Sequence, residues 1–268
     1  MTDTPAEPAT EPPAPGTSPV PVIPAIAIYL ASFQILTAGI LMSTVPYDSP
    51  TFARSFIPVE AAVAITMLLG TWLFFRPAVI GLRMPRIENW KYLAPMGVML
   101  LVGLIVWIAR WASVPEGAER DMALTLGSFV ATFMIGFTEE WMYRGLVLVL
   151  LVHWLGPRKG GLLSLALFGL VHAMNIVGGL AWWVALIQVP SAALSGAVFL
   201  LAALGTRSIL LPILGHALWD FFLVDGGQAA SLGGESLAVG WVIPMPLLMG
   251  SVSLFLLRGL MRPKPFAD

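Results

Sequence analysis

The sequence has no cysteine and few charged side chains. Only 11% of its 268 residues are Asp, Glu, Lys or Arg, whereas 58% are hydrophobic. Soluble domains carry about 25% charged residues, so the composition excludes an ordinary soluble domain and predicts an integral membrane protein. Without cysteine the chain has no disulfide framework, no thiolate metal site and no cysteine nucleophile. A net charge of −1 argues against nucleic acid as a partner.

The first 21 residues contain neither Lys nor Arg. A secretory signal requires a basic region ahead of its apolar stretch, and this segment is instead rich in Pro, Ala, Thr and Glu. Such a composition is typical of a disordered tail with polyproline character. We therefore divide the chain into a proline-rich tail, residues 1–21, and a membrane domain, residues 22–262.

Long apolar runs fill the membrane domain. A transmembrane helix needs about 20 apolar residues, and eight runs reach roughly that length. We predict an all-α, polytopic membrane protein with about eight transmembrane helices, at residues 23–44, 57–75, 92–109, 122–155, 161–178, 181–204, 208–224 and 241–257.

The distribution of Lys and Arg predicts the orientation of these helices, because cytoplasmic loops carry an excess of both residues. If the N-terminus is cytoplasmic, ten of the 14 basic residues fall on that side, three fall outside and Arg144 lies in the membrane. Both termini are then cytoplasmic, and the plasma membrane of a prokaryote is the expected location. In this topology Asp225 lies in an external loop, residues 225–240, while Glu60 and His153 lie at the membrane interfaces.

Ionisable residues inside the predicted helices are rare. A carboxylate at the centre of a bilayer costs at least ~2.5–3.5 kcal/mol, so each one needs a partner or a function. The helical rise of ~1.5 Å per residue puts these residues near the middle of the membrane on three separate helices, where they can form one site. They are Glu139, Glu140 and Arg144 in 122–155, His172 in 161–178, and His216 and Asp220 in 208–224.

Helix spacing separates the two adjacent glutamates. Glu140 and Arg144 are four residues apart and share a helix face, so they can form an ion pair. Glu139 points ~100° away, and without that partner it can exchange protons. Two similar groups in different surroundings are what acid–base chemistry requires. His216 and Asp220 are also four residues apart, so the carboxylate can accept a hydrogen bond from the imidazole and fix its tautomer.

Three motifs in these helices resemble those of the CPBP family of intramembrane endopeptidases, which includes CaaX-processing proteases and bacteriocin-processing or immunity proteins. The sequence EEWMYR (139–144) is similar to EExxxR, FGLVH (168–172) to FxxxH, and HALWD (216–220) to Hxxx[N/D]. The resemblance covers about residues 90–260, which would be the protease core.

The resemblance implies a role for each motif. Glu139, with His172, would activate a water molecule that attacks the scissile carbonyl of a membrane-associated protein or peptide. His216 and Asp220 would stabilise the oxyanion, and the second glutamate and the arginine of the first motif would form a structural ion pair. An ionised Asp220 cannot donate a hydrogen bond. Either it is protonated, or it orients His216 while His216 alone donates, and we favour the second.

The same residues allow other chemistries. They could form a buried polar cluster that only holds helices together, a zinc site or the pathway of an ion- or solute-coupled transporter. The HExxH motif of metalloproteases and the internal repeats of many transporters are absent from the sequence, as is the GxGD of aspartyl intramembrane proteases. Ser195, in ALSGA, is better explained by packing than as a serine nucleophile.

The expected function is therefore a glutamic intramembrane protease that works without metal or other cofactor. Zinc dependence, a transporter, and a non-catalytic immunity or scaffold protein of the same fold are the alternatives. The lipid bilayer and a membrane-associated substrate are the expected partners. A prenylated CaaX tail, a leader peptide and a C-terminal sorting segment all fit as substrates, and the sequence does not determine the oligomeric state.

Overall fold

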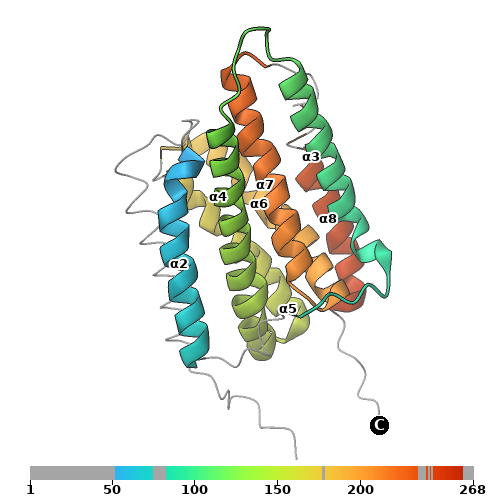
Figure 1. The fold of residues 1–268 in the computed structure, drawn as a ribbon. Helices are drawn as coiled ribbons and strands as arrows, with labels where there is room; N and C mark the ends of the chain where they lie inside the picture. Colours follow the sequence, from blue (N-terminus) through green and yellow to red (C-terminus); the bar gives the residue numbers. More distant parts are fainter. Residues whose placement is uncertain are drawn as a thin grey trace, which may run out of the picture.

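The computed structural model describes residues 52–74, 83–176, 179–234 and 244–261, together with 240 and 242. Within these residues all regular structure is helical and no strand is present, so the predicted all-α class is confirmed. The helices lie side by side in a bundle (Figure 1). Their bounds are α2 Phe52–Phe74, α3 Ala94–Ala112, α4 Met122–Glu140, α5 Leu148–Val171, α6 Trp182–Thr206, α7 Leu210–Ser231 and α8 Pro244–Leu260.

Three stretches of the described chain are long and apolar enough to cross a membrane. Together with the composition, this finding identifies an integral membrane protein. The three stretches are Ala94–Ala112, Met122–Ile176 and Trp182–Thr206.

Helices also occupy other predicted spans. α2, α7 and α8 overlap the second, seventh and eighth apolar runs, expected at 57–75, 208–224 and 241–257. The total of about eight spans stays a prediction, because the span expected at 23–44 and the tail at 1–21 lie outside the described residues.

No loop separates α4 from α5, because the seven residues between them, Trp141–Val147, form a π-helix. The helical backbone breaks at Gly156 (φ 77°, ψ 168°), a conformation that favours glycine, and Pro157 follows it. Beyond this break α5 packs back on its own first part, since a Cβ on Gly160 would lie 2.5 Å from the carbonyl carbon of Leu151. The predicted boundary between the fourth and fifth spans therefore lies inside α5.

The contact between α4 and α7 brings the first and third motifs together (Figure 1). It depends on Gly136, which lies about one turn before the two glutamates of α4. A Cβ at this position would lie 2.9 Å from the backbone nitrogen of Ala217 and 3.0 Å from the carbonyl oxygen of Ile213. Only glycine lets the two backbones approach this closely, so Gly136 sets the distance between the α4 glutamates and His216.

We expect Gly136→Ala to push α4 away from α7. The added methyl group meets backbone atoms that cannot rotate aside, so the free energy of unfolding should fall by about 1–3 kcal/mol. Thermal unfolding of the purified protein in detergent measures the change. Gly97→Ala in α3 is the matched control, because nothing lies within 4 Å of its Cβ position. Equal unfolding temperatures for the two variants would contradict this role of Gly136.

The C-terminal end of α7 differs from the expected topology. The prediction that Asp225 lies in an external loop is wrong, because α7 continues to Ser231 and this side chain is completely buried. Asp225 Oδ2 accepts hydrogen bonds from the indole nitrogens of Trp107 and Trp111, each at 2.8 Å, and from Arg120 Nη2 at 3.0 Å. The glycines after Asp225 are typical of a loop, but these contacts from α3 and the segment before α4 hold the chain in a helix.

Candidate active site

The two glutamates of the first motif lie where α4 passes into the π-helix. Glu139 and Glu140 are the last residues of α4, and all seven residues of the π-helix are buried. A π-helix has wider turns than an α-helix and often occurs at functional sites. Hydropathy alone predicts one regular helix over residues 122–155, so the sequence pattern did not reveal this feature.

Arg144 lies inside the bundle and pairs with Glu140. Its Nη1 lies 2.9 Å from Glu140 Oε1, so the ion pair expected from the four-residue spacing is present, and both side chains are buried. Arg144 Nη2 donates to the carbonyl oxygen of Gly196 at 2.8 Å, and the guanidinium lies 4.2 Å from the centroid of the Phe168 ring. A Cβ on Gly196 would lie 3.1 Å from Arg144 Nη2 and 2.8 Å from Phe168 Cδ1, so this position requires glycine.

His216 is held at its Nδ1 by a residue from another helix. Nδ1 lies 3.0 Å from Glu140 Oε1, the same oxygen that pairs with Arg144. Because a carboxylate oxygen only accepts, Nδ1 carries the hydrogen. The ring also stacks on Phe199, with centroids 4.8 Å apart. Sequence spacing indicated Asp220 as the partner of this ring, but it did not indicate Glu140.

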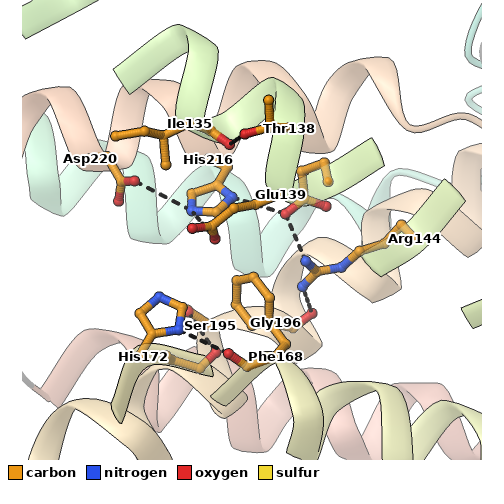
Figure 2. A network of polar contacts seen from close by, with 12 residues as sticks. Ile135, Thr138, Glu139, Arg144, Phe168, His172, Ser195, Gly196, His216 and Asp220 are labelled. Carbon is orange, nitrogen blue, oxygen red and sulfur yellow. Dashed lines mark hydrogen bonds and ion pairs between the residues drawn. The ribbon is translucent and has the colours of Figure 1, made fainter. Parts of the chain in front are cut away.

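The other ring nitrogen of His216 faces two carboxylates (Figure 2). Nε2 lies 3.4 Å from Asp220 Oδ2 and 3.8 Å from Glu139 Oε2. Glu139 Oε2 and Glu140 Oε2 are both buried without a hydrogen-bond partner in the described part of the chain, but Glu140 Oε1 has two partners, Arg144 and His216. The adjacent glutamates thus have different surroundings. The side chains of Asp220, Glu139 and Glu140 are 26%, 11% and 0% exposed, so Asp220 is the most exposed of the site carboxylates.

His172 approaches the same site from the end of α5. The α-helix ends at Val171, and His172 begins a 3₁₀-helix that runs to Ile176, so the described end of the predicted span 161–178 is helical but not α-helical. His172 Nδ1 donates to the carbonyl oxygen of Phe168 at 2.8 Å, which leaves Nε2 of the neutral ring as an acceptor. In Figure 2 the ring lies across from Glu139, with Nε2 directed toward it.

Comparison with known protein families finds one that this part of the chain resembles. Residues 121–222 match the model of a family described as type II CAAX prenyl endopeptidase, Rce1-like. Residues 121–222 are thus similar to this family, and we refer to this stretch as the Rce1-like domain. The match confirms the family that the three motifs resemble, and all three motifs lie within it. No curated protein and no solved structure matches the chain.

The Rce1-like domain brings the motif residues into one arrangement, although they come from three separate segments (Figure 2). Phe168, the first residue of the second motif, lies at its centre. Its ring centroid is 5.2 Å from that of His172 and 5.9 Å from that of His216, and the Arg144 guanidinium lies over it. The sequence motif includes this phenylalanine, but it did not predict contacts with both imidazole rings and the guanidinium.

Glu60 is a second residue whose position the sequence did not reveal. The prediction that it lies at the membrane interface is wrong, because its side chain is 1% exposed and accepts a hydrogen bond from Thr138 Oγ1 at 2.7 Å. α2 packs along α4 (Figure 1), and this contact carries the carboxyl group into the bundle. The only signal in the sequence was a single glutamate in an apolar run, and a position near the end of a membrane helix accounts for such a residue as well as burial does. His153 is exposed, and its place at a membrane interface stays a prediction.

The described residues give evidence on two of the alternative functions, a zinc site and a serine nucleophile. Among them, no group of three or more His, Asp or Glu side chains is arranged to hold a metal ion. The hydroxyl of Ser195 donates to the carbonyl oxygen of Ala192 at 2.9 Å, a local bond within α6. The ionisable groups that face one another in the Rce1-like domain are therefore carboxylates, imidazoles and one guanidinium.

Proposed function

We propose that the Rce1-like domain is a glutamic intramembrane endopeptidase in which Glu139 acts as general base. The position of Glu139 Oε2 is the main support: it is buried, it has no hydrogen-bond partner among the described residues, and it lies 3.8 Å from His216 Nε2. His172 presents an acceptor nitrogen from the opposite side (Figure 2). A water molecule between these groups can donate to both, which makes its oxygen nucleophilic.

In the proposed reaction Glu139 takes one proton from water while the water oxygen bonds to the scissile carbonyl carbon. The carbonyl electrons move onto oxygen and form a tetrahedral oxyanion, to which His216 donates a hydrogen bond through Nε2. The proton held by Glu139 then passes to the leaving amine as the carbon–nitrogen bond breaks. Glu139 returns to its ionised form, and one water is consumed for each peptide bond.

The other motif residues, Glu140, Arg144 and Asp220, orient His216 and stabilise its charge. Glu140 Oε1 contacts both Arg144 and His216 Nδ1, which leaves Nε2 as the nitrogen that faces the substrate. Glu140 and Arg144 then form the structural ion pair, and Glu140 also orients the His216 ring, which donates from both nitrogens when it is protonated. Asp220, 3.4 Å from Nε2, stabilises the protonated ring as a carboxylate.

The family supports a membrane-associated protein or peptide as substrate. We expect the peptide to enter beside Asp220, the most exposed of the site carboxylates. A prenylated CaaX tail is the first substrate class to test, and leader and C-terminal sorting peptides follow. In this proposal the enzyme needs no metal or other cofactor, resides in the plasma membrane of a prokaryote with both termini in the cytoplasm, and has its protease core at about 90–260.

A reconstituted cleavage assay tests the proposal. Full-length protein in liposomes is mixed with a farnesylated CaaX peptide that carries a fluorophore and a quencher, and with unprenylated and leader peptides in parallel. We expect cleavage that persists in a metal chelator and is absent from Glu139→Gln. Loss of activity in the chelator with recovery on added Zn²⁺ would replace the metal-free mechanism with a zinc mechanism. Failure of the folded protein to cleave any of these peptides would favour a non-catalytic or transport function.

Asp220→Asn is expected to lower the cleavage rate about tenfold, which equals about 1.4 kcal/mol of transition-state stabilisation. The amide keeps the size of the side chain but removes the negative charge that stabilises protonated His216. Complete pH–rate profiles of both proteins measure the effect, and unfolding temperatures in detergent separate it from lost stability. If the variant matches wild type near neutral pH and stays active at high pH, where wild type fails, Asp220 acts as a protonated oxyanion donor and our assignment is wrong.

A further inference from the structure

Glu60 is a buried carboxyl group that the proposed reaction does not use. It belongs to α2, its side chain is 1% exposed, and its hydrogen bond goes to Thr138 Oγ1 at 2.7 Å. Burial of a carboxyl group is costly unless the group is hydrogen-bonded, and burial of an ionised one costs more still. A hydroxyl group can satisfy one oxygen but cannot neutralise a charge, so the presence of Glu60 inside the bundle needs an explanation.

The hydrogen bond between Thr138 and Glu60 can reverse its direction. Thr138 Oγ1 lies 2.7 Å from Glu60 Oε2, 3.0 Å from the carbonyl oxygen of Met134 and 3.1 Å from that of Ile135. Its single hydrogen can go to only one of these acceptors. When Glu60 is ionised, Thr138 donates to the carboxylate. When Glu60 is protonated, it donates to Thr138, and the hydroxyl turns to a backbone carbonyl. Thr138 therefore satisfies both protonation states of Glu60.

The place of this pair in the bundle links it to the general base. Thr138 directly precedes Glu139 in α4, so the hydrogen bond from Thr138 holds the carboxyl group of Glu60 beside the residue next to the general base. A negative charge on one carboxylate opposes ionisation of a nearby one, so the charge of Glu60 affects that of Glu139. The other ionisable groups around Glu139 are Glu140 on α4, Tyr143 and Arg144 on the π-helix, His172 after α5, and His216 and Asp220 on α7.

We propose that Glu60 is a positioning residue that tunes the general base. Its carboxyl group gains or loses a proton while it stays hydrogen-bonded to Thr138, and its charge then sets the pH at which Glu139 ionises. The expected effect on cleavage rests on the proposed function. The coupling between the two carboxyl groups is a property of the folded protein, and it can be measured whether or not the protein cleaves a peptide.

Infrared spectroscopy of the full-length protein in liposomes tests the coupling without a substrate. The carbonyl stretch of protonated carboxyl groups is followed against pH, and the signal of Glu139 is the part that Glu139→Gln removes. We expect Glu60→Gln to move the midpoint of this signal to lower pH by about one unit, because a neighbouring negative charge is lost. Glu119→Gln, which removes an exposed carboxyl group, should leave it in place. An unchanged midpoint in Glu60→Gln would overturn the proposal.

Two substitutions at Thr138 form a second, matched test that does not depend on whether Glu60→Gln folds. Thr138→Ser keeps the hydroxyl group, whereas Thr138→Val keeps the shape without it. We expect the serine variant to retain the wild-type midpoint of Glu139 and the valine variant to shift it to lower pH, because Glu60 without its donor stays protonated. Equal midpoints in the two variants would show that the hydroxyl has no such role.

The cleavage assay separates this inference from the proposed function. If the protein cleaves peptides, the acid limb of the pH–rate profile should move to lower pH in Glu60→Gln, in the same direction as the infrared midpoint. If the midpoint moves but no peptide is cleaved, the coupling stands and the protease function fails. A shifted rate profile with an unshifted Glu139 midpoint would assign the effect of Glu60 to another group and contradict the proposal.

Discussion

Glu139→Gln should reduce the rate of peptide cleavage by about 10²–10⁴-fold or more, the range that a general base contributes. The substitution keeps the size of the side chain but leaves no group at this position that can take a proton from water. His172 and His216 remain, yet neither has the position of Glu139 Oε2, which is buried and lies 3.8 Å from His216 Nε2. Initial rates with the farnesylated CaaX peptide in liposomes measure the loss.

The variant should keep its fold, which makes the result interpretable. Glu139 Oε2 has no hydrogen-bond partner among the described residues, so an amide at this position breaks no hydrogen bond of that atom. We expect an unfolding temperature in detergent close to that of wild type. Glu119→Gln, at an exposed position, is the control and should keep the full rate. Wild-type cleavage by pure Glu139→Gln protein would exclude Glu139 as the base.

Arg144→Ala should destabilise the protein by about 3–5 kcal/mol, the cost of removing one partner of a buried ion pair. The change leaves Glu140 buried beside His216 without its guanidinium partner, and it removes the donor to the carbonyl oxygen of Gly196. It also removes the cation that lies over the Phe168 ring. Thermal or denaturant unfolding in detergent measures the change in free energy.

Two further variants show whether the loss comes from this geometry. Arg258→Ala removes an exposed arginine from α8 and should change stability little. Arg144→Lys keeps the charge, but an ammonium group lacks the planar fork that reaches Glu140 and Gly196 together, so it should recover only part of the loss. An Arg144→Ala protein with the unfolding midpoint and activity of wild type would show that the ion pair has no structural role.

The features that could be predicted from sequence are those that depend on local order along the chain. The apolar runs determine the membrane class and the all-α fold, because each run satisfies its backbone groups within one helix. The four-residue spacing of Glu140 and Arg144 puts them within reach of each other whatever else they contact, and the structure contains that pair. The motif EEWMYR, with FGLVH and HALWD, was sufficient to indicate the family.

Tertiary structure alone decided which faces of distant helices meet. Helices that are apolar on all sides carry little information about their neighbours, so the burial of Glu60 against α4 and of Asp225 against α3 could not be read from the sequence. The contact of His216 with Glu140 depends on the close approach of α4 and α7 at Gly136. The sequence by itself thus determined the chemical groups of the site and their helices, whereas packing decided their partners, because a side-chain contact between helices depends on interhelical distance and rotation.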